Sequence, residues 1–123
     1  MQVVLSLGTN TDYGNIQIAE ERLQNLFSAV RVSRTIVSPA VDHPGELPDY
    51  ANAVMIGETT IDYDDFRSIL KNVEREMGRS DSKDKKHVPM DIDILQYGKT
   101  RYKTKDWLRP YNVMLLNEMA VIQ

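Results

Sequence analysis

The stretch MDIDIL (residues 90–95) combines the alternation of a β-strand with two carboxylates. Side chains of a strand alternate between its two faces, so Asp91 and Asp93 should share one face, about 7 Å apart at their Cα atoms. Met90, Ile92 and Ile94 should point the other way, into a hydrophobic core. The pattern therefore predicts a sheet with one buried face and a pair of acids on the opposite face.

The shared face of Asp91 and Asp93 has two interpretations. Like charges repel each other, and removing them from water is costly unless a cation or strong donors balance them. A divalent metal would supply that balance, and Mg²⁺ favours carboxylate oxygens while keeping bound water for a phosphate-bearing ligand. Alternatively, the face belongs to a solvated edge strand, where charged residues serve solubility alone.

Length and composition indicate a single domain over residues 1–123. A chain of 123 residues can bury one core, and 41% hydrophobic with 27% charged residues is ordinary for a globular protein. The absence of cysteine excludes disulfides and zinc–thiolate sites. A formal charge of −3 does not favour nucleic-acid binding, and no apolar run is long enough to span a membrane. Without a secretory signal pattern at the N-terminus, a cytoplasmic location is expected.

Hydrophobic spacing divides the chain into strands and helices. Strands are predicted at residues 2–7, 31–38, 50–58 and 90–97, and helices at residues 15–30 and 62–78. Asp62 or Asp64 should cap the second helix, and Gly78 should end it. Apolar residues on both faces of 50–58 indicate a central strand. A short helix is expected from Asn112 to Ile122.

The order strand, helix, strand, strand, helix, strand predicts an α+β fold of the ferredoxin-like split βαβ type (βαββαβ). Its sheet should be mostly antiparallel, with the two longer helices on one face and a short helical tail at the C-terminus. Many unrelated functions occur on this fold, so the fold alone does not select one.

Four motifs occur in order along the chain: VLSLGTN (4–10), PDYANAV (48–54), Glu74 followed by MGR (77–79), and PMDIDIL (89–95) with Gly98. Together they resemble the 6-hydroxymethyl-7,8-dihydropterin pyrophosphokinase family of folate biosynthesis, with this chain as a short and diverged member. The resemblance implies transfer of the terminal diphosphate of ATP to the hydroxymethyl group of the pterin, with release of AMP. It also implies two Mg²⁺ ions, held by Asp91 and Asp93, which bridge the phosphates during an in-line displacement.

The resemblance assigns further residues to two small-molecule partners, a pterin and a nucleotide. Arg79 is the expected catalytic residue beside the metal ligands Asp91 and Asp93, as a phosphate contact. The pterin candidates are Ser38, Pro39, Val41, Tyr50 and Asn52. The nucleotide candidates are Lys71, Glu74, Lys83, Lys86, Ile94 and Tyr111.

Physical arguments support some of these assignments and leave alternatives for others. The amide of Asn52 can donate and accept, which suits the edge of a pterin ring, and Tyr50 shares its strand face and is able to stack on the ring. Otherwise Asn52 satisfies a loop backbone and Tyr50 is ordinary packing. Glu74 either holds a loop or the backbone that shapes the site, or, as a helix residue, forms an exposed ion pair. Arg79 follows a helix-ending glycine, where a cation already favours the helix dipole.

Several positions depart from the family pattern. The family carries several arginines and a tryptophan in the loop before the two acids, whereas the loop here retains only Arg79, with lysines such as Lys83 and Lys86 as point charges. Tyr111 replaces a histidine, and Met119 replaces an aromatic residue. The alternative function is therefore a diverged protein that binds a pterin-like heterocycle or a nucleotide without turnover. A purely structural domain is a third alternative, and no feature of the sequence indicates an oligomeric state.

Overall fold

The computed structural model of the chain describes residues 1–41, 44–79 and 86–119. In chain order its elements are β1 (Gln2–Thr9), α1 (Asn15–Leu23), the 3₁₀ turn η1 (Gln24–Leu26), β2 (Ala29–Val32), β3 (Ile36–Ser38), β4 (Tyr50–Glu58), α2 (Tyr63–Glu76), β5 (Asp91–Tyr97), β6 (Thr100–Arg101), α3 (Thr104–Trp107) and α4 (Pro110–Glu118). The order contains the predicted βαββαβ arrangement, followed by a C-terminal tail.

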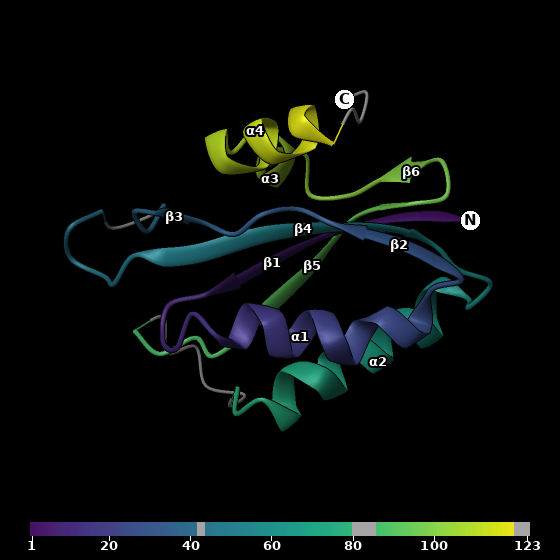
Figure 1. Cartoon of the computed structure of the whole chain (residues 1–123), viewed down its shortest axis with the longest axis horizontal. Helices are drawn as coiled ribbons and strands as arrows, with labels where there is room; N and C mark the ends of the chain where they lie inside the picture. The colour runs from purple at the N-terminus through teal and green to yellow at the C-terminus, as the bar shows by residue number, and fades with distance from the viewer. Residues whose placement is uncertain (42–43, 80–85, 120–123) are drawn as a thin grey trace.

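The strands form an antiparallel sheet in the order β2-β4-β1-β5-β6, with β3 also paired to β4 (Figure 1). β4 lies inside the sheet and its residues 51–57 are buried, which confirms the central strand predicted at 50–58. The order and direction of the strands are those of the ferredoxin-like fold. The predicted fold class is therefore confirmed.

The predicted boundaries between residues 15 and 38 are wrong. Helix α1 ends at Leu23, and Val30 lies in β2 opposite Gly57 of β4. In β2 the backbone forms ladder hydrogen bonds with β4. This pairing overrides the helical spacing of the apolar side chains that had extended the predicted helix to Val30. The predicted strand 31–38 is split into β2 and β3 because Ser33 interrupts the ladder. Its hydroxyl oxygen accepts a hydrogen bond from the Val54 N–H at 2.8 Å, and its own N–H donates to Val54 O at 2.9 Å.

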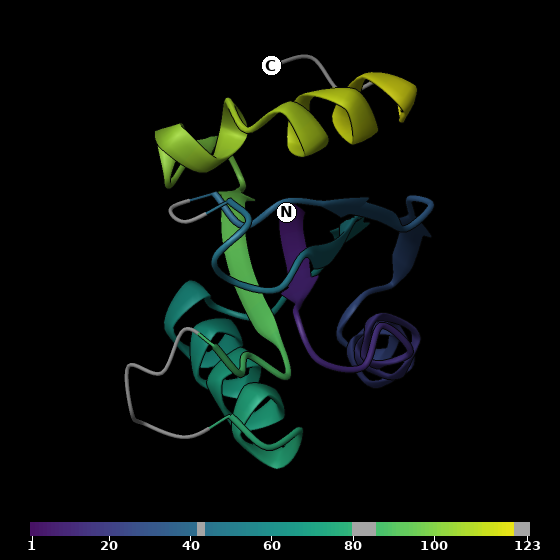
Figure 2. The same ribbon diagram turned by 90° about the vertical axis from the view of Figure 1, so that its left-hand side faces the viewer.

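Helices cover both faces of the sheet (Figure 1 and Figure 2). α1 and α2 lie on one face, where they enclose a core that includes Leu5, Met55 and Phe66. The tail of α3 and α4 covers the opposite face and encloses a second core that includes Leu95 and Trp107. The indole N–H of Trp107 donates to Leu95 O at 2.7 Å, which ties the tail to β5. The two predicted helices thus share a face, and the predicted tail covers the other.

The two ends of helix α2 lie where the sequence predicted them. Gly78, at φ 103°, ends α2 in the left-handed conformation that glycine adopts readily. Asp62 holds the N-cap position of α2, without a capping hydrogen bond from its side chain.

The C-terminal helix α4 begins at Pro110, earlier than predicted, because proline is favoured in the first turn of a helix. Residues 120–122 of the predicted helix lie outside the described residues. No described helix is long and apolar enough to cross a membrane.

Candidate active site

Three strands bring polar side chains together on the face covered by α3 and α4. β1 lies between β4 and β5, and its Gly8 is in register with Asn52 on one side and with Asp91 on the other. Ser6, further back in β1, is opposite Asp93. Cross-strand neighbours, and side chains two residues apart in one strand, share a face. The sheet therefore presents Asn52, Asp91 and Asp93 on one surface, as the alternation of residues 90–95 predicted for the two acids.

This surface is the floor of a cavity, which we call the acidic cavity. All the predicted pterin residues line it: Ser38, Pro39, Val41, Tyr50 and Asn52. The tail contributes Asp106, Arg109 and Tyr111 to its wall. Among its described lining residues, the acids Asp91, Asp93 and Asp106 outnumber one cation, Arg109. Acidic side chains thus predominate among the charged residues that line the cavity, and the structure gathers the predicted pterin residues in one place.

A second cavity, which we call the cationic cavity, lies at the edge of β5 beside α2. Two predicted nucleotide residues, Lys71 of α2 and Ile94 of β5, line it together with Arg67 and Lys103. Asp93 is the acid among its described lining residues, so three cations face one carboxylate there. Asp93 lines both cavities, so the two adjoin at this residue.

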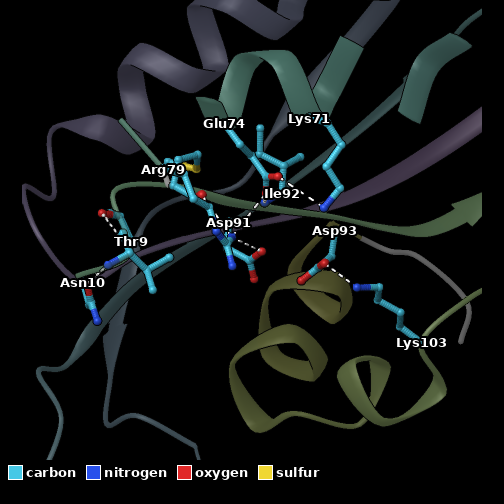
Figure 3. A network of polar contacts seen from close by, with 11 residues as sticks. Thr9, Asn10, Lys71, Glu74, Arg79, Asp91, Ile92, Asp93 and Lys103 are labelled. Carbon is cyan, nitrogen blue, oxygen red and sulfur yellow. Dashed lines mark hydrogen bonds and ion pairs between the residues drawn. The ribbon is translucent and has the colours of Figure 1, made fainter. Parts of the chain in front are cut away.

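Each of the paired carboxylates has a cationic partner (Figure 3). Arg79 Nη1 donates to Asp91 Oδ1 at 2.7 Å, and Lys103 Nζ donates to Asp93 Oδ1 at 2.6 Å. Burial, followed by the charge of Asp91, raises the pKa of Asp93 to about 7, and the ammonium of Lys103 opposes this shift only in part. The ammonium of Lys103 therefore does not fully offset the cost of burying the charged form of Asp93 beside Asp91.

The donor atoms of Asp91 and Asp93 suit Mg²⁺, the metal that the family resemblance implies. The two carboxylates line the same cavity from one face of β5, and carboxylate oxygens are the ligands that Mg²⁺ prefers. The described residues contain no group of three or more His, Asp or Glu side chains arranged to hold a metal. An ion here would therefore take its other ligands from water and phosphate oxygens, as Mg²⁺ commonly does.

Glu74 forms the expected ion pairs, but it is buried, so the prediction that it is exposed is wrong. Its side chain is 4% exposed, and it accepts a hydrogen bond from the Ile92 N–H at 2.7 Å. Lys71 and Arg79 each lie 3.4 Å from one of its oxygens. β6 pairs with β5 only at Gln96 and Tyr97, so Glu74 supplies the acceptor that a neighbouring strand would otherwise provide at Ile92.

The consequence of this contact is that α2 is tied to β5 directly behind the two acids. Burial is the largest influence on Glu74 and raises its pKa, whereas the hydrogen bond from the Ile92 N–H lowers it. A contact of Glu74 with a nucleotide stays a prediction.

Asn52 is held by contacts within the protein. Its amide nitrogen donates to Ser38 Oγ at 2.8 Å and to Tyr50 O at 3.2 Å, as expected if it satisfies the local backbone. In the part of the chain that the structure describes, no group donates to its amide oxygen. Asn52 therefore keeps one acceptor that is able to serve a ligand in the acidic cavity.

The remaining nucleotide candidates are dispersed. Lys83 lies outside the described residues, and Lys86 is exposed in the loop before β5. Tyr111 lines the acidic cavity rather than the cationic one, and burial is the main cause that raises its pKa to about 12. Lys103 and Asp106 were not assigned from the sequence, because the tail has no periodic pattern that would place it over the sheet.

The fold and the two cavities define an α+β domain in which one of two neighbouring carboxylates, Asp93, lines both cavities. A family model described as 7,8-dihydro-6-hydroxymethylpterin-pyrophosphokinase matches residues 4–121. The chain therefore belongs to this family, as the four sequence motifs predicted.

Relatives with curated descriptions are bifunctional proteins of folate synthesis. A mitochondrial folate synthesis bifunctional protein of Arabidopsis thaliana is 31% identical over 120 residues, which cover 89% of this chain and 20% of the relative. The folate synthesis bifunctional protein of Chlamydia caviae is 29% identical over 124 residues, which cover 89% of this chain and 26% of the relative. The chain thus spans about a fifth to a quarter of the length of these relatives.

Proposed function

We propose that this chain transfers diphosphate from ATP to the hydroxymethyl group of 6-hydroxymethyl-7,8-dihydropterin, with release of AMP, in folate biosynthesis. The observation that supports it best is that the acidic and cationic cavities meet at Asp93. Two substrates that exchange a group need adjoining sites with the reacting atoms at the junction. Asp93, one of the two carboxylates that suit a phosphate-bound metal, is the residue that the cavities share, and Asp91 lies beside it in the acidic cavity.

In this proposal the pterin lies in the acidic cavity. The amide oxygen of Asn52 accepts a hydrogen bond from the donor edge of the ring, and the side chain of Tyr50 packs against its flat face. The hydroxymethyl group then points towards Asp91 and Asp93, on the floor of the same cavity.

The nucleotide lies along the cationic cavity, where Arg67, Lys71 and Lys103 favour an anionic ligand. Two Mg²⁺ ions bound at Asp91 and Asp93 would neutralise charge on the phosphates and orient the group that is transferred. Arg79 holds the carboxylate of Asp91 in position through their hydrogen bond.

The test is the AMP formed by the full chain from ATP and Mg²⁺, with and without 6-hydroxymethyl-7,8-dihydropterin. AMP formation should depend on the pterin and should fall by roughly 100-fold or more in Asp93→Asn. Asp64→Asn, which changes an exposed acid of α2 outside both cavities, is the matched control. If high enzyme concentrations yield no pterin-dependent AMP, the proposal is refuted.

A second candidate function is binding of a pterin-like heterocycle or a nucleotide without turnover. It is favoured by the ion pairs of Asp91 with Arg79 and of Asp93 with Lys103, which give both acids a partner without a metal. Calorimetry together with the AMP assay separates the two functions, because a non-catalytic protein would bind the pterin or the nucleotide and form no AMP. The cytoplasmic location and the lack of nucleic-acid and membrane partners stay predictions from the sequence.

A further inference from the structure

We infer that Lys103 is a tethered cation of this site, which neutralises Asp93 before the nucleotide binds and contacts the phosphate oxygens of the bound nucleotide afterwards. The inference rests on the proposed function, because it assigns a positioning residue to the same site. Lys103 lines the cationic cavity, and its ammonium reaches Asp93 at the junction of the two cavities (Figure 3).

The backbone at Lys103 is fixed relative to β5. With φ 51° and ψ 57°, Lys103 is the one non-glycine residue at positive φ in residues 1–41, 44–79 and 86–119. This conformation is unfavourable for a residue with a Cβ atom, and it persists only where neighbouring contacts impose it. The contacts here are backbone hydrogen bonds: the Tyr102 N–H donates to Leu95 O at 2.9 Å, and Lys103 O accepts from the Asp106 N–H at 2.8 Å. The side chain therefore starts from a defined point beside Asp93.

The side chain of Lys103 is placed to exchange partners. It is 52% exposed, and among the described residues Asp93 is the acceptor for its ammonium. The guanidinium of Arg79, on the other acid, also donates to Met90 O and to Glu74. When a divalent ion takes the carboxylates, Arg79 keeps other acceptors, whereas Lys103 loses its partner.

A released Lys103 has a new anionic partner within the cationic cavity. Its neighbours there, Arg67 and Lys71, already favour an anion, and a lysine ammonium binds phosphate oxygens as a point charge without a fixed geometry. Lys103 thus supplies positive charge from the tail, in a chain whose loop before β5 lacks most of the arginines of the family pattern.

The experiment is calorimetric titration of the full chain with Mg²⁺ alone, and with ATP at saturating Mg²⁺. Lys103→Met removes the charge and keeps the length of the side chain. It should bind Mg²⁺ about fivefold more tightly, since no ammonium competes for Asp93. At saturating Mg²⁺ it should bind ATP about fivefold more weakly, in line with a half-exposed ion pair. Lys103→Arg should restore the affinity for ATP. Lys105→Met, an exposed lysine of α3 outside both cavities, is the control and should match the wild type.

The outcomes separate this inference from the proposed function. If Lys103→Met leaves either affinity unchanged, or weakens Mg²⁺ binding, the inference is overturned while the proposed function stands. If the wild type binds Mg²⁺ and ATP but forms no AMP, the proposed function fails alone. A wild type that binds neither Mg²⁺ nor ATP refutes both. Thermal melting of each variant checks that the fold is retained.

Discussion

Replacing Glu74 with alanine should destabilise the fold by about 2–3 kcal/mol. The carboxylate is almost fully buried and accepts the Ile92 N–H, so its removal leaves a buried donor unpaired, which alone costs roughly 1–3 kcal/mol. The larger penalty of about 3–5 kcal/mol, which applies when a buried ion loses its partner, is not expected for Arg79. The guanidinium of Arg79 is partly exposed and keeps Asp91 and Met90 O as acceptors.

Urea unfolding followed by circular dichroism measures this loss from the midpoint and slope of the transition. Glu74→Gln keeps an acceptor oxygen and should lose only about 1 kcal/mol. Glu76→Ala removes an exposed acid of the same helix that pairs with Arg22, and should change stability by less than about 1 kcal/mol. A loss in Glu74→Ala no greater than that in Glu76→Ala would refute the conclusion that Glu74 ties α2 to β5.

Two further predictions follow from burial and close packing. The pKa of Asp93 is raised from 3.8 to about 7 in the folded chain, so across this interval the folded state holds a proton that the unfolded state has released. In the absence of Mg²⁺, the contribution of Asp93 to the free energy of unfolding should therefore fall as the pH rises through this interval. The difference in stability between the wild type and Asp93→Asn, measured by urea unfolding at several pH values, should change accordingly, and a difference that does not depend on pH would contradict the shift. Gly57→Ala would place a Cβ 2.5 Å from Phe27 Cδ1, so the free energy of unfolding should fall by roughly 1–3 kcal/mol. Thermal unfolding measures this loss, and a melting temperature equal to that of the wild type would exclude so close an approach.

Local periodicity was sufficient for the elements that bury one face by their own pattern. β1, β4, β5 and α2 lie where alternation or helical spacing predicted them, within a few residues at their ends. It failed between residues 15 and 38, because pairing with β4 and the hydroxyl of Ser33 decide that segment. These contacts join residues far apart in the chain, and no short window of sequence contains them.

The same distinction applies to the site. The two-residue period of a strand places Asp91 and Asp93 on one face, and short motifs along the chain indicate the pterin pyrophosphokinase family. The strand period and the motifs are properties of neighbouring residues, so the sequence alone is enough to reveal them. Packing decided the partners of the acids. Lys103 reaches Asp93 only because the tail lies over the sheet, and Glu74 is buried only because α2 lies against the open edge of β5. Such ion pairs and hydrogen bonds depend on how whole elements cross in space, which local spacing does not encode.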